Sequence, residues 1–132
     1  MRDGEKEFSL LECVDFTHTS MGSRMIRKWL MFPLTDVKRI ISRQNHVDLF
    51  VNNRPLLKKF GLQLDGILDI ERLAGRIAMD KAHAKDLQAL KTSLVLWISA
   101  QESLGSFNFA SMDTKPAKEI IELISKSILD DP

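Results

Sequence analysis

The strongest metal ligands in the sequence are one cysteine and three histidines, and their spacing does not predict a metal site. Zinc ligands usually come in local pairs such as C-x-x-C or H-x-x-x-H. No such pair occurs among Cys13, His18, His46 and His83. We therefore interpret Cys13 as a structural thiol and His18 as a loop histidine. With a single cysteine, no internal disulfide can form.

Gly61 and Gly66 have the spacing of the phosphate-binding loop G-x-x-x-x-G-K-[S/T]. The lysine that reaches the phosphates and the hydroxyl that holds magnesium are missing, because Ile67 and Leu68 stand in their places. No predicted strand leads into this segment. We predict that the two glycines bracket a loop between helices and bind no nucleotide.

Three acidic residues cluster around the same glycine turn, and paired carboxylates can act as a general acid and base. They are Asp65, Asp69 and Glu71. Asp69 is better explained as a helix N-cap, because its carboxylate can accept backbone N–H bonds of the first turn. Glu71 fits a first-turn charge that complements the helix dipole. We predict structural roles for both.

A basic edge on another predicted helix contains Arg24, Arg27 and Lys28, which could contact phosphate groups. We favour a solvated helix face, or salt bridges to a neighbouring helix. Trp29 and Trp97 both fall within helical apolar stripes, so we predict that they are core residues rather than platforms for base stacking.

The elements that must position these residues are helical, because apolar residues follow a helical spacing nearly everywhere and no period-two alternation is sustained. We predict an all-α fold, an irregular multi-helix bundle of about six helices. Residues 1–132 form a single domain, and residues 1–7 are expected to be flexible. The predicted helices cover 20–32, 35–53, a short segment from 55, 69–77, 84–101 and 115–129, with Thr35, Asp69 and Thr114 as N-caps.

Two residues of the 69–77 helix allow specific expectations. Leu73 lies in the middle of its apolar stripe and should face the core. Gly75 lies about 140° around the helix from Ile70, away from that stripe, so we expect open space beside it.

Composition limits the classes of function. Nineteen basic and eighteen acidic residues give a net charge of +1, whereas a domain that binds nucleic acid through its own charge usually has a clear basic excess. Charge segregated onto one face stays possible. No apolar run approaches the roughly 20 residues of a membrane span, and the charged N-terminus does not resemble a signal peptide. We expect a cytoplasmic protein without a membrane partner.

A long ordered match lies in residues 9–36, SLLECVDFTHTSMGSRMIRKWLMFPLTD. It resembles the opening of the core domain of the MutS family of DNA mismatch repair proteins. The resemblance continues at 66–73, GILDIERL, and covers about residues 8–131. Phe16 departs from the family pattern, where a basic residue is common, and so do residues 80–84. Six positions within the matched motifs are expected to be structural: Met21, Gly22, Arg24, Trp29, Asp69 and Leu73.

The resemblance implies that the chain is the first part of the MutS core (lever, domain III), ending before the clamp insertion. Such a module would transmit conformational change between the DNA clamp and the ATPase domain, with no catalytic, cofactor or metal site of its own. The resemblance also implies a longer, homodimeric parent that uses ATP and Mg²⁺. The partners would be the connector, clamp and ATPase domains, and mismatched DNA through the parent.

Two alternatives remain at this point. One is a helical protein–protein interaction module unrelated to repair. The other is a small helical DNA-binding regulator that uses Arg24, Arg27 and Lys28, against which the near-neutral charge argues.

Overall fold

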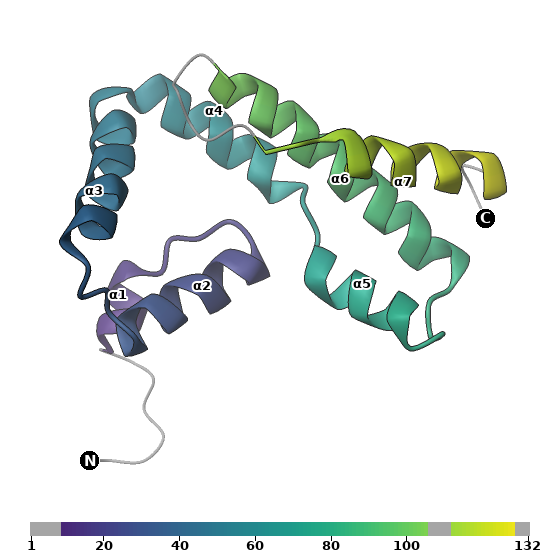
Figure 1. Cartoon of the computed structure of the whole chain (residues 1–132), viewed down its shortest axis with the longest axis horizontal. Coiled ribbons are helices and arrows are strands. Elements are labelled where there is room, and N and C mark those ends of the chain that lie inside the picture. Colours follow the sequence, from purple (N-terminus) through teal and green to yellow (C-terminus); the bar gives the residue numbers. More distant parts are fainter. Residues whose placement is uncertain (1–8, 106–111, 129–132) are drawn as a thin grey trace.

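Seven helices form the part of the chain that the computed structural model describes, residues 9–105 and 112–128 (Figure 1). No strand occurs in these residues, so the all-α prediction is confirmed. Six helices correspond to predicted ones, and the additional one is the short α1. The helices are α1 Leu10–Val14, α2 Ser20–Met31, α3 Val37–Asn52, α4 Arg54–Asp65, α5 Ile70–Ala78, α6 Ala84–Leu104 and α7 Lys115–Ser127.

The helix boundaries follow from capping side chains. Asp69 accepts the backbone N–H of Arg72 and caps α5, as predicted. The prediction of Thr35 as the cap of α3 was wrong by one residue. Asp36 takes that position, and its carboxylate accepts the N–H groups of Lys38 and Arg39. A carboxylate complements the positive end of the helix dipole, which a hydroxyl does not.

The core lies around α6, the longest helix, against which α4, α5 and α7 pack (Figure 1). Its best-buried cluster joins α6 to α7 through Leu90, Leu94, Ala117 and Ile124. Leu73 of α5 packs against this cluster and is partly buried, so the predicted apolar face of α5 is turned to the core. Trp97 is also partly buried there, in agreement with its predicted place in the core.

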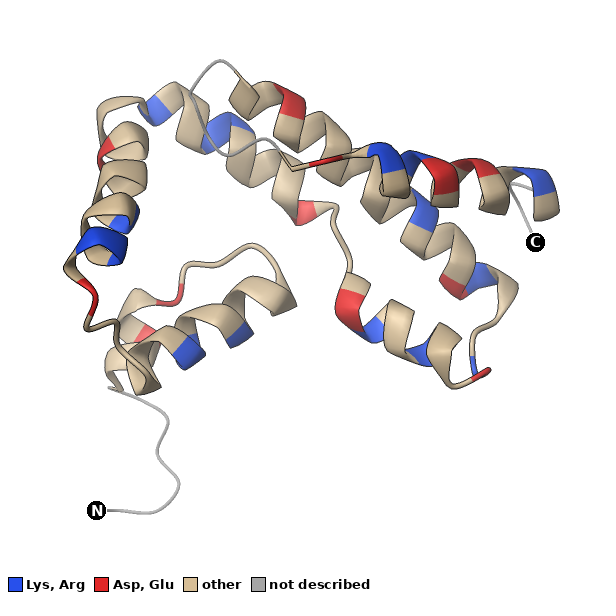
Figure 2. Ribbon diagram, in the orientation of Figure 1, with Lys and Arg blue, Asp and Glu red and all other residues tan. Residues whose placement is uncertain are grey.

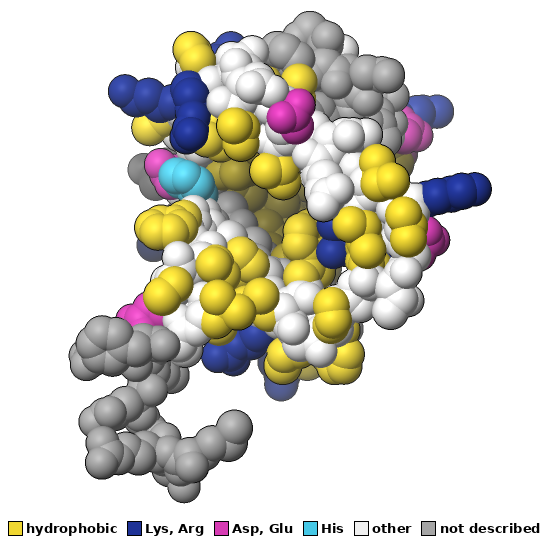
Figure 3. Space-filling view, turned by 90° about the vertical axis from the view of Figure 1, so that its left-hand side faces the viewer, with side chains coloured by type: hydrophobic (Ala, Val, Ile, Leu, Met, Phe, Trp, Pro, Cys, Tyr) yellow, Lys and Arg dark blue, Asp and Glu magenta, His cyan; other side chains and the backbone are white. Residues whose placement is uncertain are grey.

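The helices α1 to α3 lie to one side of this core (Figure 1). Among the described helices, α1 packs with α2, while α3 packs with α4. The space-filling view shows a hollow on this side, with hydrophobic side chains around it and Lys and Arg at its margins (Figure 3). We call residues 9–52 the arm; it contacts the α4–α7 core through the packing of α3 on α4.

The prediction that Gly61 begins a loop was wrong. Gly61 is buried inside α4, and only Gly66 lies beyond the end of that helix. Apolar residues at helical spacing, Leu57, Phe60 and Leu64, continue through the glycine and keep the helix intact. The missing side chain at Gly61 makes room for the His18 ring, as described below.

The prediction of Trp29 as a core residue was also wrong. Trp29 keeps 43% of its surface exposed, and the guanidinium of Arg43 lies 3.7 Å from the centre of its ring. Periodicity correctly placed Trp29 on the apolar side of α2. It could not show that the Trp29 ring stays partly exposed, with Arg43 of α3 over it.

Three sequence expectations lie outside the described residues. They concern residues 1–7, residues 106–111 of the segment between the helices predicted at 84–101 and 115–129, and the end of the last helix at residue 129. None of the described helices has the length and apolar character needed to cross a membrane.

Candidate functional site

The candidate site is a junction of polar side chains that holds the arm on the core. It begins in the loop between α1 and α2, where Asp15 acts as an acceptor for three donors. The Thr17 hydroxyl and the Ser23 hydroxyl each donate to Asp15 over 2.6 Å, and the Thr17 N–H donates over 3.2 Å. These hydrogen bonds, the one from Ser23 foremost, lower the pKa of the Asp15 carboxyl. The loop is thereby fixed to the first turn of α2.

Thr19 and Gly22 complete this loop. The Thr19 hydroxyl caps α2 by accepting the N–H of Gly22 over 3.0 Å. A Cβ atom on Gly22 would lie 3.1 Å from both Thr17 Cβ and Thr19 Oγ1, closer than ordinary contacts allow. Glycine is therefore the residue that permits the loop to fold back on the helix. Met21, beside it, is partly buried.

Arg24 connects α2 to the N-terminus of α5. Its Nη1 donates to Asp69 Oδ2 over 2.6 Å and its Nη2 to Asp69 Oδ1 over 2.9 Å, which makes a bidentate pair. Nη2 also donates to Glu71 Oε2 over 2.6 Å. We call these three residues the Arg24 clasp. The Asp69 side chain is only 17% exposed, so its pair is better shielded from water than the pair with Glu71 at 70%.

The electrostatics of the clasp are reciprocal. The Arg24 hydrogen bond lowers the pKa of the Asp69 carboxyl from 3.8 to about 2, with help from the Arg72 N–H and against partial desolvation. Hydrogen bonds to Asp69 and then Glu71 raise the pKa of Arg24 above its already high value. Asp69 is therefore a cap and an ion-pair partner at once, and it stays ionised at neutral pH.

A second contact joins the same loop to α4. His18 Nδ1 lies 2.7 Å from Asp65 Oδ1, near the C-terminal end of α4. The His18 ring rests on Gly61, where a Cβ atom would lie 2.9 Å from Nε2. Only glycine admits the ring at this distance. Gly61, which has the spacing of a phosphate-loop glycine but was predicted to begin a loop without nucleotide, thus serves as a contact surface for the arm.

The other residues considered for chemistry do not assemble into a site. No group of three potential metal ligands from His, Cys, Asp and Glu occurs among the described residues. Cys13 is exposed on α1. His83 begins α6, where its N–H donates to Asp86 over 2.9 Å and lowers the pKa of that carboxyl. Asp86 also pairs with Arg76 over 2.9 Å, which ties α5 to α6.

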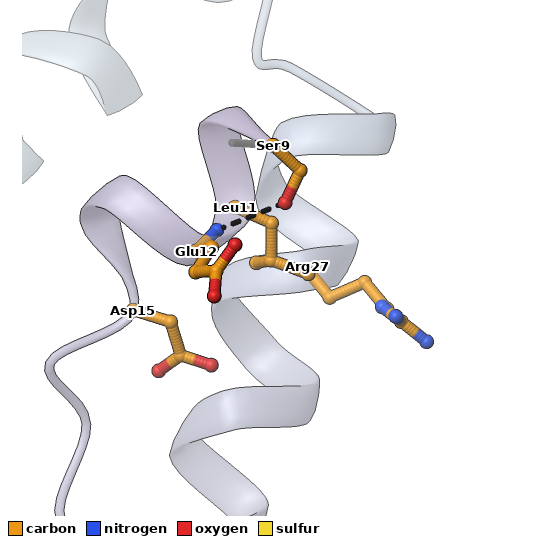
Figure 4. Close-up of a pocket in the computed structure, with 5 residues that line it drawn as sticks. All are labelled: Ser9, Leu11, Glu12, Asp15 and Arg27. Carbon is orange, nitrogen blue, oxygen red and sulfur yellow. Dashed lines mark hydrogen bonds between the residues drawn. The ribbon is translucent and has the colours of Figure 1, made fainter. Parts of the chain in front are cut away.

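One small cavity beside the junction, about 310 Å³ in volume, has mixed polar lining (Figure 4). Its lining residues are Ser9, Leu11, Glu12, Asp15 and Arg27. Arg27 extends away from the Asp15 carboxylate (Figure 4). The Asp15 oxygens are already occupied by Thr17 and Ser23. Asp15 and Arg27 therefore do not form an acid–base pair or a joint anion site.

The sequence identified several of these residues without showing how they meet. Arg24, Gly22 and Asp69 were singled out, and salt bridging of Arg24 to a neighbouring helix was one favoured reading. The pairing with Asp69, 45 residues away, could not be read from local spacing. His18–Asp65 was missed, and the only available signal was the run of Thr, His and Ser before α2. Arg27 and Lys28 are exposed and form no ion pair with another described residue, as expected for a solvated face.

Fold and junction together define a helical structural module whose polar residues hold helices to one another. The family model for MutS domain III matches residues 1–132, so the chain belongs to the MutS family through that domain. It is 36% identical to the DNA mismatch repair protein MutS of Halothermothrix orenii, over 100% of this chain and 15% of that protein. The MutS of Thermosipho melanesiensis is 35% identical, over 98% and 16%. That of Caldicellulosiruptor saccharolyticus is 40% identical, over 96% and 15%.

The chain thus spans about a sixth of the length of these curated relatives. No solved structure matches it significantly. The interaction-module and DNA-regulator alternatives are both replaced by a core module of MutS.

Proposed function

We propose that this module transmits conformational change within a MutS-type mismatch repair ATPase, and that the Arg24 clasp is the point through which the arm and the core move together. The chain's membership of the MutS family, through domain III, supports the proposal that it works as part of such a protein. The observation that carries the proposal is the bidentate Arg24–Asp69 pair, because it connects α2 of the arm to α5 of the core, two helices that are otherwise little packed against each other.

The physical argument concerns how motion passes between two packed bodies. A coupling element needs two discrete arrangements that both sites can bias. A large apolar interface would hold the arm in one position. A clasp built on one arginine and two carboxylates can open with little loss of buried surface, since Arg24 is 49% exposed. It also restricts the arm to one orientation when closed, because a bidentate pair fixes the plane of the guanidinium.

The further parts of the proposal rest on the family and go beyond this chain. The parent protein binds ATP with Mg²⁺ and mismatched DNA, forms a homodimer, and acts in the cytoplasm. In the parent, the module continues into a clamp and lies between connector and ATPase domains. No step of nucleotide hydrolysis is assigned to residues of this chain.

The test is a substitution in the complete MutS protein that carries this chain. Arg24→Leu is expected to leave ATP binding and mismatch binding near their original affinities when each is measured alone. The factor by which ATP changes mismatch affinity should fall by roughly fivefold or more, a change within the usual range of coupling between sites.

Arg27→Leu is the matched control, because Arg27 lies on the same helix, is exposed and forms no ion pair with another described residue. Its coupling factor should stay unchanged. Equal loss of coupling in both variants, or full coupling in Arg24→Leu, would contradict the proposed role of the clasp.

A further inference from the structure

Positive charge is strongly segregated along this chain. Residues 20–60 contain nine Lys and Arg and two Asp, a net charge of +7, whereas the whole chain has +1. Arg24 is paired in the clasp and Arg43 lies over Trp29. The remaining seven are exposed: Arg27, Lys28, Lys38, Arg39, Arg54, Lys58 and Lys59. They lie on α2, at the start of α3 and along the first half of α4 (Figure 2).

Between these basic groups, α3 carries an apolar stripe that no described helix covers. Val37, Ile41, Val47 and Val51 are between 49% and 65% exposed. At about 100° per residue they fall within an arc of about 120° on the helix surface. With a rise of about 1.5 Å per residue, the stripe from Val37 to Val51 extends along about 21 Å of α3. We call this stripe, with the basic residues at its two ends, the α3 face.

A shallow groove runs beside the stripe. It has a volume of about 560 Å³ and is lined by Trp29, Arg43, Gln44, Asn45, Val47, Asp48 and Val51. Its walls are an exposed indole, two valines and polar side chains on the rim. Asp48 is the one acidic side chain among these lining residues. An apolar strip with a polar rim is the surface into which an amphipathic helix docks.

We propose that the α3 face is a docking site for an acidic amphipathic helix of a separate protein, whose apolar side covers the stripe and whose carboxylates meet the basic ends. Two features argue for this occupant. Burial of the exposed valines and isoleucine is favourable only against a partner that has an apolar surface of its own. The phosphate backbone of a nucleic acid offers no such surface. The cations around the stripe, which form no ion pair with another described residue, complement a negative partner and accelerate the encounter of two separate molecules.

Charge also argues against a second copy of this chain on the same face. In a two-fold arrangement, the same patch on both copies would contact itself. An antiparallel pairing of α3 helices would then place the basic group at one end against the basic group at the other. Like charges brought together in this way suppress self-association.

The experiment measures binding to the 132-residue chain by isothermal titration calorimetry. The probe is a synthetic helical peptide of about 18 residues with leucine on one side and glutamate on the other, and the matched peptide carries lysine instead. The acidic peptide is expected to bind at least about tenfold more tightly, a difference that charge complementarity readily supplies. Equal binding of the two peptides would overturn the proposal.

Variants locate the site. Val47→Gln with Val51→Gln should weaken the acidic peptide about tenfold through lost burial. Lys58→Glu with Lys59→Glu should weaken binding of the acidic peptide several-fold. The affinity that remains should depend less on salt concentration than that of the original chain. Matched controls on α7, Leu123→Gln and Lys115→Glu with Lys118→Glu, should change nothing, because those side chains are also exposed but lie away from the α3 face. Circular dichroism verifies that each variant is folded.

Three outcomes identify other occupants and overturn the proposal. A DNA duplex that binds more tightly than the peptide, with sensitivity to the lysine changes alone, would make the face a nucleic-acid surface. Concentration-dependent dimerisation abolished by the valine changes would indicate a second copy. In the full natural polypeptide, thermal unfolding should be unaffected by Val47→Gln; a lower midpoint would mean that the polypeptide covers the face itself.

Discussion

The substitution Gly75→Ala distinguishes two explanations for the glycine at this position: that a close helix contact requires it, or that it only lowers the stability of the helix. Gly75 lies inside α5, and a Cβ atom built there meets no atom within 4 Å. The open space expected from its angular position is therefore confirmed. Alanine loses less backbone freedom than glycine on folding, so the substitution should stabilise the chain by about 0.4–1 kcal/mol through the unfolded state. For a domain of this size the corresponding rise in melting temperature is roughly 1–5 °C.

The assay is urea denaturation followed by circular dichroism at 222 nm, with Gly22→Ala as the comparison. Gly22 lies in the first turn of α2, where the new methyl group would approach Thr17 and Thr19 to 3.1 Å. Those atoms are held by hydrogen bonds to Asp15 and Gly22, so they cannot easily give way. The two alanines should therefore have opposite effects. A loss above about 1 kcal/mol in Gly75→Ala, the range of overpacking, would refute the reasoning and indicate a close contact at α5.

Three further predictions address the core, the clasp and the absence of chemistry. Leu73→Ala should destabilise the chain by about 2 kcal/mol, the low end of the range for a leucine, because Leu73 is only partly buried. The control Leu123→Ala, on the exposed side of α7, should change stability by less than about half a kcal/mol. Because folding lowers the pKa of Asp69 to about 2, its contribution to stability is present above pH 3.8 and is lost as the pH falls towards 2. Asp69→Asn keeps a capping side chain but no charge, so its denaturation midpoint should be lower than that of the parent chain at pH 7, and the two midpoints should converge near pH 2; a constant difference across that range would contradict the ion pair. The purified chain should neither hydrolyse ATP nor prefer mismatched over matched DNA, and hydrolysis that survives purification and responds to a point mutation in this chain would contradict its structural role.

Helices could be predicted from the sequence because their signals are local. The apolar spacing of α2, α5 and α7 and the cap at Asp69 depend on residues within one or two turns. The prediction at Gly61 was wrong because it used a local signal where a long-range contact decides. Glycine disfavours a helix locally, but the contact that accounts for it comes from His18, 43 residues earlier in the chain.

The junction could be predicted only in part, because it depends on long-range geometry. The motif around residues 15–24 singled out Gly22 and Arg24, and the motif around 66–73 singled out Asp69. Neither motif states that Arg24 reaches Asp69, since 45 residues of turning chain separate them. Trp29 shows the same limit, because periodicity gives the side of a helix on which a residue lies but not whether another helix covers it.

The central claim is that the Arg24 clasp holds the arm against the core. It is tested most directly by the distance between spin labels on the two parts, measured by double electron–electron resonance. Labels go on Lys28→Cys in α2 and Lys85→Cys in α6, both exposed positions, in a chain that also carries Cys13→Ser. We predict a single narrow distance distribution in this chain and a distinctly broader one when Arg24→Leu is added, with helicity unchanged. An unaltered narrow distribution in Arg24→Leu would contradict the account.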